Sequence, residues 1–363
     1  MKMYTVNMKS FSLIAVTILL VGGAVFAVAI WLDRGNAVPY TEIDLSRNAL
    51  INPPQTPIAN TPIALSAARV ISPFLMPDGV SVRYYLPDTG QIYEITPSAP
   101  KNQTLVAKLK PGAMKIVWSR DGSIAIASYT DGLIRYDLAK NTSAPVNEKI
   151  FDPVFSPYSD DIAYVYFDED TGEGNISVAD GAFSAYKNLM KTRLQNWRIQ
   201  WISKTMLAMS AISPENQLHN LFTLDTETKK LTPVLENQKE FKALWSPDGN
   251  TLLFSRVKSK ATQLLWMRSG DAAAQIIPLE TPASRCAWAR PNDQQVGRAS
   301  VTVIYCASES KLVRIRIGDT ADPIQVASIT DAEDILISPD QRTAIYRNYR
   351  DGRIYAIHLT KIP

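Results

Sequence analysis

Seven copies of one short pattern constrain the fold of this chain more than any other feature of its sequence. In each copy a short apolar run ends on a large apolar residue, and a turn residue follows three positions later. We call the apolar residues blade anchors. They are Leu75, Trp118, Phe155, Trp201, Trp245, Trp288 and Ile337, spaced 37 to 49 residues apart. A period of this length is typical of repeat architectures such as β-propellers.

The turn residue is Asp in four copies and has drifted in the other three. The four are Asp78, Asp121, Asp248 and Asp340, and the drifted positions hold Tyr158, Lys204 and Pro291. In SPDG (246–249) Pro presets φ, Asp accepts hydrogen bonds from nearby backbone, and Gly tolerates positive φ. A catalytic carboxylate would occupy one unique setting. The recurrence therefore predicts a structural role for these aspartates.

Strand-like stretches follow each turn at regular intervals. Examples are TLLFSRV (251–257), RIYAIHL (353–359) and, as a fourth strand in most copies, IQVAS (324–328). Alternating apolar and polar residues predict strands. Four strands in about 40 residues make a propeller blade. We therefore predict an all-β, seven-bladed propeller, with six or eight blades as alternatives because three copies are degenerate.

The ends of the repeat array predict how the ring closes. The seventh copy stops after RIYAIHLTKIP and lacks a fourth strand, whereas PIALS (62–66) precedes the first copy without a blade of its own. We predict that residues 62–66 supply the outer strand of the last blade. Such pairing would remove an open sheet edge.

Residues 62–363 resemble the WD40-like, Asp-containing propeller repeats of TolB and related extracytoplasmic proteins. The resemblance rests on WSRDGSIAIAS (118–128), LWSPDGNTLLFS (244–255) and ISPDQRTAIY (337–346). It implies a propeller fold and often a protein-binding role. The N-terminal α/β domain of TolB is not evident in this chain. Since propellers carry many unrelated activities, the resemblance is informative for fold and weak for function.

The N-terminal segment predicts a membrane anchor. Residues 11–32 carry no charge and are long enough for a helix to cross a bilayer. Lys2 and Lys9 precede them, so the positive-inside rule places residues 1–10 in the cytoplasm and the rest in the periplasm or outside the cell. The alternative is a signal peptide cleaved after Ala29. Pro-rich residues 33–61 then form a semi-extended tether.

Two clusters are weak binding candidates. Asp168, Glu169, Asp170 and Glu173 lie close together in FDEDTGEGN (167–175), and oxygen ligands of this kind hold Ca²⁺, with Asp168 and Asp170 as the candidate ligands. Their spacing does not match an EF-hand, and a hairpin turn is the alternative. Trp197 and Arg198 follow AYKNLMKTRLQ (185–195), which favours a short helix or irregular insert. They could bind an anionic sugar or a partner, and a solvated edge is the alternative.

The two cysteines lie in the first hairpin of the sixth copy. Cys286 precedes the anchor Trp288 by two residues, and Cys306 lies in the following strand. Antiparallel pairing would place them opposite each other, and an oxidising compartment would then favour a disulfide. Two buried free thiols are the alternative. Neither cysteine has the neighbours of a redox or nucleophilic site.

Composition and motifs narrow the function. The 38 Lys and Arg residues nearly balance 35 Asp and Glu residues, without the basic stripe that nucleic-acid binding requires. No nucleophile elbow, P-loop or dinucleotide fingerprint is present, so we assign no catalytic residue and no cofactor. The leading hypothesis is a membrane-tethered, single-pass envelope protein that binds a protein partner. The alternatives are a glycan-binding module and a hydrolase acting on a glycan or peptide.

Overall fold

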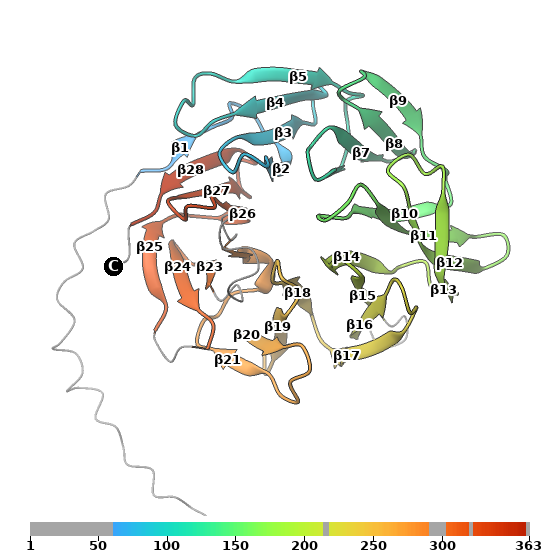
Figure 1. Ribbon diagram of the computed structural model, residues 1–363. Helices are drawn as coiled ribbons and strands as arrows, with labels where there is room; N and C mark the ends of the chain where they lie inside the picture. The colour runs from blue at the N-terminus through green and yellow to red at the C-terminus, as the bar shows by residue number, and fades with distance from the viewer. Residues whose placement is uncertain (1–60, 213–217, 290–302, 319–321, 361–363) are drawn as a thin grey trace, which may run out of the picture. The chain divides into compact units, whose positions relative to one another are not determined.

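The computed structural model describes residues 61–212, 218–289, 303–318 and 322–360. In these residues, seven antiparallel sheets of four strands surround a common axis (Figure 1). The first strand of each sheet lies innermost and the fourth outermost. The predicted seven-bladed propeller is therefore confirmed for the repeat region. Residues 1–60, which include the predicted anchor (11–32) and most of the tether, lie outside the described residues.

The first four blades follow the chain order without a crossover. Blade 1 contains β2 (Ile71–Leu75), β3 (Val82–Leu86), β4 (Gln91–Ile95) and β5 (Thr104–Lys108). Blade 2 contains β6 (Lys115–Trp118), β7 (Ile124–Tyr129), β8 (Gly132–Asp137) and β9 (Thr142–Pro145). Blade 3 contains β10 (Ile150–Phe155), β11 (Ile162–Asp168), β12 (Glu173–Ala179) and β13 (Tyr186–Thr192). Blade 4 contains β14 (Arg198–Ser203), β15 (Met206–Ile212), β16 (His219–Asp225) and β17 (Leu231–Gln238).

The last three blades include the closing strand from the beginning of the array. Blade 5 contains β18 (Lys242–Trp245), β19 (Thr251–Lys258), β20 (Ala261–Arg268) and β21 (Gln275–Ile277). A 3₁₀ turn, η2 (Ala283–Arg285), leads into blade 6, which contains β22 (Cys286–Trp288), β23 (Val303–Ser308), β24 (Lys311–Arg316) and β25 (Ile324–Ser328). Blade 7 contains β26 (Ala332–Ile337), β27 (Thr343–Asn348), β28 (Ile354–His358) and β1 (Ile63–Ala64).

β1 closes the ring at the place that the sequence pattern gave it. It pairs antiparallel with β28, with Ile63 opposite Ala356. The backbone N–H of Leu65 donates to the carbonyl of Ile354 at 2.9 Å, which extends the contact beyond the strand. Segments almost 300 residues apart thus share one sheet, and blade 7 has its fourth strand.

The structure corrects the expectation for residues 185–195. Instead of a helix or irregular insert, Tyr186–Thr192 form β13, the outer strand of blade 3. Only Leu189 among them is fully buried. Because an outer strand has little surface to bury, its apolar alternation is weak. Pairing with β12 decides its conformation.

The hydrophobic core is divided among the seven interfaces between successive blades. Each of the seven clusters of buried residues draws its members from two neighbouring sheets. All seven anchors are at most 9 % exposed, so they belong to these interfaces. Burial of large apolar side chains between sheets contributes about 1.5–3 kcal/mol for each. The repeated aromatic anchors thus explain why a ring of separate sheets holds together.

Three tryptophan anchors also donate a hydrogen bond to the preceding blade. The indole N–H groups of Trp118, Trp201 and Trp288 reach the carbonyls of Ser72, Val154 and Leu244 at 2.9, 3.2 and 3.2 Å. The fourth, Trp245, has a buried Nε1 without an acceptor in the described residues. The interface between blades 4 and 5 therefore lacks the indole bond found at the other three.

We expect Trp288→Phe to lower the free energy of unfolding by about 1 kcal/mol more than Trp245→Phe does. Both changes remove similar ring area, but only the first removes a hydrogen bond, worth about 0.5–1.5 kcal/mol net. Urea unfolding of both variants measures the difference. Equal losses would show that the indole bond contributes nothing to the joint between blades.

The recurring aspartates pin the turns between the first and second strands. Oδ1 of Asp340 accepts hydrogen bonds from the Ser338 hydroxyl at 2.6 Å and the Arg342 N–H at 3.0 Å. The same serine hydroxyl accepts the N–H of Thr343, which begins β27. Burial alone would raise the pKa of Asp340, but these hydrogen bonds hold it below its usual range. The carboxylate thus serves the turn, as its recurrence indicated.

Candidate binding rim

The residue three positions before each anchor lies in the inner strand of its blade or, in blade 6, in the 3₁₀ turn η2 that leads into that strand. In blades 1, 3 and 7 this position lies in a β-bulge. These seven inner positions are Ser72, Lys115, Asp152, Arg198, Lys242, Arg285 and Asp334. Because every blade has the same strand order, the inner strands run in the same direction and begin at the same rim. Four of the seven positions are basic. We call Lys115, Arg198, Lys242 and Arg285 the basic arc.

The two acidic inner positions are already paired. Asp152 accepts contacts from Lys115 at 3.2 Å and Arg198 at 3.4 Å, and it also accepts the N–H of Ile199 at 2.9 Å. Its side chain is only 7 % exposed, whereas that of Arg198 is 77 % exposed. Asp334 pairs with Arg347 at 2.7 Å. These two carboxylates therefore hold their basic partners in place, and the positive charge of Arg198 still faces solvent.

Lys242 and Arg285 are the other two members of the basic arc. Neither has a carboxylate partner in the part of the chain that the structure describes. Lys242 is exposed, and Arg285 lies 5.2 Å from the ring of Tyr349, in the turn after β27. A guanidinium over an aromatic face keeps its charge and its free N–H groups. Both cations are available to an anionic ligand.

A cavity of about 440 Å³ opens between blades 4 and 5 beside the basic arc. Its walls include Arg198, Lys242, Gln200, His219 and the anchor Trp245. Burial and the nearby Lys242 charge lower the pKa of His219, so its imidazole is mostly neutral at pH 7. The wall therefore combines two cations with amide, hydroxyl and apolar groups, and no carboxylate lines it among the described residues. Such a lining suits a carboxylate better than a cation.

The acidic loop forms the hairpin turn between β11 and β12. Lys149 lies 2.8 Å from Asp168 and lowers the pKa of that carboxyl through its hydrogen bond. The Gln195 amide donates to Glu169 at 3.0 Å, and the backbone N–H of Asp170 donates to Asp168. Within the described residues, no group of three or more His, Cys, Asp or Glu side chains could hold a metal ion. Glu173 lies at the start of β12, so the four acids are spread along a hairpin.

Trp197 and Arg198 have different environments. Trp197 is 6 % exposed, donates its indole N–H to Thr192 at 2.8 Å and packs edge-on against Phe222. It therefore belongs to the core between blades 3 and 4 and has no surface for a ligand. Arg198 projects from the rim as part of the basic arc. Trp197 immediately precedes β14, and Arg198 is the first residue of that strand.

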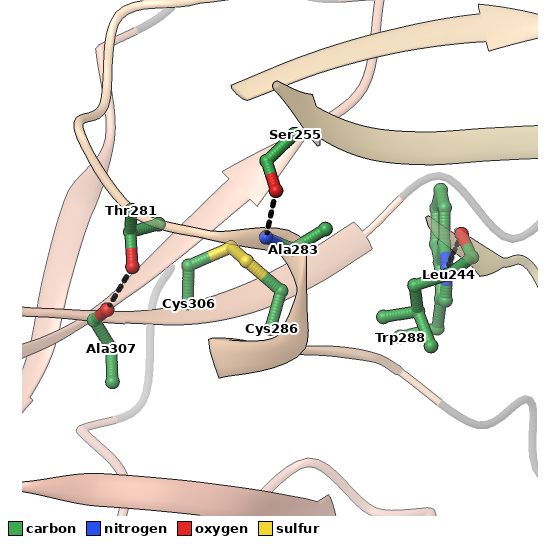
Figure 2. The surroundings of a disulfide bond; sticks show 8 residues. All are labelled: Leu244, Ser255, Thr281, Ala283, Cys286, Trp288, Cys306 and Ala307. Atoms are coloured by element: carbon green, nitrogen blue, oxygen red, sulfur yellow. Dashed lines mark hydrogen bonds between the residues drawn. A yellow bond between two sulfur atoms is a disulfide. The ribbon is translucent and has the colours of Figure 1, made fainter. Parts of the chain in front are cut away.

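Cys286 and Cys306 face each other across β22 and β23 and form a disulfide (Figure 2). Both are buried in the interface between blades 5 and 6. Nearby, the Thr281 hydroxyl donates to the Ala307 carbonyl, and the Ala283 N–H donates to the Ser255 hydroxyl (Figure 2). The disulfide thus joins the two innermost strands of blade 6 and has no exposed sulfur for chemistry.

The basic arc was not found from the sequence, although a signal was present. Aligning the copies on their anchors and comparing the position three residues earlier would have shown Lys, Arg, Lys and Arg. The turn pattern lies after each anchor, whereas this signal lies before it.

No helix in the described residues is long and apolar enough to span a membrane. The predicted anchor (11–32) lies outside the described residues.

Comparisons with known proteins support the fold. No family model and no curated protein matches the sequence. Among solved structures, an oligogalacturonate lyase in complex with manganese is 9 % identical with a TM-score of 0.62, covering 84 % of this chain and 97 % of that one. The β-propeller domain of Myceliophteria thermophila Swd1 is 11 % identical with a TM-score of 0.53, covering 83 % and 100 %. Kuenenia stuttgartiensis hydrazine synthase is 12 % identical with a TM-score of 0.55, covering 82 % and 99 %. At these identities the likeness shows the propeller fold alone.

Proposed function

We propose that this protein is a non-catalytic binding module of the cell envelope that recognises an acidic protein partner with the basic arc. The observation that carries the proposal is the inner ring, in which four of seven equivalent positions are basic and both acids are paired. If these basic side chains served only the fold, we would expect each of them to be paired with a carboxylate. The excess instead favours capture of carboxylates, because Arg and Lys bind them with charge-assisted hydrogen bonds.

The protonation behaviour of the carboxyl groups favours binding over hydrolysis. A general acid or a shared-proton pair has a raised carboxyl pKa. In the described residues, nine aspartates have a pKa below the ordinary value of a carboxyl group. These groups accept hydrogen bonds from turns or cations and stay ionised. We therefore rank the hydrolase hypothesis below the binding module.

Location in the envelope rests on two further arguments. The apolar segment 11–32 and the Pro-rich tether would hold the propeller away from a membrane surface. The Cys286–Cys306 disulfide suits an oxidising compartment. We propose that the propeller lies outside the cytoplasm on a single-pass anchor, where a rim of rigid strands presents the basic arc to its partner.

We expect the double change Lys242→Glu and Arg285→Glu to weaken binding of poly-L-glutamate about tenfold or more. Reversing two unpaired cations replaces attraction by repulsion, and a tenfold loss corresponds to about 1.4 kcal/mol. Fluorescence anisotropy with the full chain in detergent at low salt measures the effect. Raising the salt concentration should weaken wild-type binding because exposed charges are screened.

The matched control reverses two exposed lysines on the opposite rim, Lys204→Glu and Lys230→Glu. It changes the net charge by the same amount, so it separates local recognition from overall charge. We expect its affinity for poly-L-glutamate to stay within about twofold of wild type. An equal loss in both double variants would contradict a specific role for the basic arc.

A further inference from the structure

We propose that a second site, between the outer strands of blades 2 and 3, binds a short neutral oligosaccharide. A cavity of about 510 Å³ lies there, within the range of about 300–1,000 Å³ usual for small-molecule sites. It lies apart from the basic arc. None of the four basic-arc residues lines it. The sugar site and the basic arc can therefore be tested independently of each other.

One face of blade 3 supplies most of the cavity wall. Tyr164 and Tyr166 on β11 lie opposite Ser177 and Asn175 on β12, while Asn188 on β13 lies opposite Ser177. Alternate residues point to the same face of a sheet, so these five side chains share one side. The residues between them, such as Val165, Ile176 and Leu189, are buried against blade 4. One face of the blade is therefore apolar and the other aromatic and polar.

Packing between the blades accounts for only part of this face, since Tyr164 is 5 % exposed and belongs to the cluster that joins blades 2 and 3. The apolar cluster that joins blades 2 and 3 has six buried residues, the fewest of the seven interfaces in the described residues. The outer strand of blade 2, β9, has four residues and all are exposed, whereas β13 opposite has seven. The short strand leaves the face of blade 3 uncovered. The cavity is the result.

The chemistry of the lining matches sugar hydroxyls and ring faces. Tyr164 packs edge-on against Phe183 at 5.6 Å, and Tyr186 stands at the entrance with 69 % of its surface exposed. Aromatic rings present flat apolar faces, onto which the C–H face of a pyranose stacks. Asn147, Asn175 and Asn188 contribute carboxamides. The Oδ1 atoms of Asn147 and Asn188 each already accept one hydrogen bond, from the Lys149 N–H and the Ser177 hydroxyl. A hydroxyl-rich ring requires this mixture of donors and acceptors.

The charge of the lining and the position of the cavity on the sheet face indicate which class of ligand the cavity suits. No carboxylate is among the described residues that line the cavity, which disfavours a cationic ligand. Arg135 is the one charged lining residue, and its Nε already donates to the Gly181 carbonyl at 2.7 Å. A peptide bound by strand addition would pair with the backbone edge of β13. Here the polar groups are side chains on the sheet face, which favours a saccharide.

The test measures binding of maltotriose, cellotriose and triacetylchitotriose to the full chain by saturation-transfer NMR and calorimetry. We expect at least one of them to bind with a Kd at or below about 1 mM. Tyr186→Ala should raise that Kd about tenfold or more. Because Tyr186 is mostly exposed, the change should leave thermal stability almost unaltered. Asn175→Ala removes a carboxamide from the cavity wall and should also raise the Kd for the sugar.

The matched control is Leu105→Ala, at a 52 % exposed position on β5, the outer strand of blade 1. It should bind the sugar like wild type. The proposal is overturned if none of the three sugars binds. It is also overturned if Tyr186→Ala and Asn175→Ala bind as wild type does, or if only a trialanine peptide occupies the cavity.

Discussion

Replacing Gly249 with alanine is expected to lower the free energy of unfolding by about 2–5 kcal/mol. Gly249 ends the SPDG turn of blade 5 with φ of +70°, a conformation that costs an L-residue about 1–2 kcal/mol. A Cβ there would lie 2.3 Å from the carbonyl oxygen of Ile202 in blade 4. Relief of such overpacking costs a further 1–3 kcal/mol or so. Urea unfolding with circular dichroism measures the loss.

Gly270→Ala is the control for the conformational part of this effect. Gly270 has φ of +90°, but no heavy atom lies within 4 Å of the Cβ position. It should therefore lose only the left-handed cost of about 1–2 kcal/mol. The difference between the variants reports the close approach of the turns of blades 4 and 5. If both variants lose the same amount, that approach does not constrain residue 249.

Removing the disulfide through Cys286→Ala and Cys306→Ala is expected to cost about 2–4 kcal/mol. The bond closes a loop with a sequence separation of 20 residues, and a loop of this size gains about 3 kcal/mol in the chain-entropy account. The loss should appear as a lower midpoint of urea unfolding. Both sulfurs are buried, so the effect reflects stability and not altered surface chemistry.

Reductant supplies the control for the disulfide experiment. Dithiothreitol present during unfolding should lower the midpoint of the wild-type chain and leave that of the double variant unchanged. If the reductant has no effect on the wild type under conditions that unfold it, the cysteines are not joined in the protein as isolated. The same result would remove one of the two arguments for an extracytoplasmic location.

Much of the fold could be predicted from the sequence because each blade uses the same kind of buried anchor and the same kind of turn. The anchor Trp245 and the turn around Asp248 recur in other copies, so one interpretation was tested several times within one chain. The missing fourth strand of the seventh copy predicted the pairing of residues 62–66 with the last blade, and β1 pairs with β28 there. Outer strands were harder. β13 buries one side chain fully, so its sequence carries little alternation, and its pairing with β12 depends on the rest of the blade.

The candidate sites could be predicted far less well, because they depend on which faces meet. Trp197 looked like a ligand-binding aromatic, yet it is 6 % exposed in the core between blades 3 and 4, whereas the side chain of the next residue, Arg198, is 77 % exposed. The cavity between blades 2 and 3 arises from unequal lengths of β9 and β13, which no single motif encodes. Spacing alone does not show that Tyr164 and Asn188, 24 residues apart, line the same wall.

We propose above that the rim bearing the basic arc binds an acidic envelope protein. The most direct measurement places a photo-cross-linking residue at position 349, beside Arg285, and in a second variant at position 204 on the opposite rim. Irradiation in the native membrane is followed by purification through a C-terminal tag and mass spectrometry. We predict that one acidic envelope protein is captured from position 349, that it is absent from position 204, and that Lys242→Glu with Arg285→Glu abolishes the capture. Recovery of the protein without a cross-linked partner from both positions, or equal capture from both rims, would contradict partner binding by the basic arc.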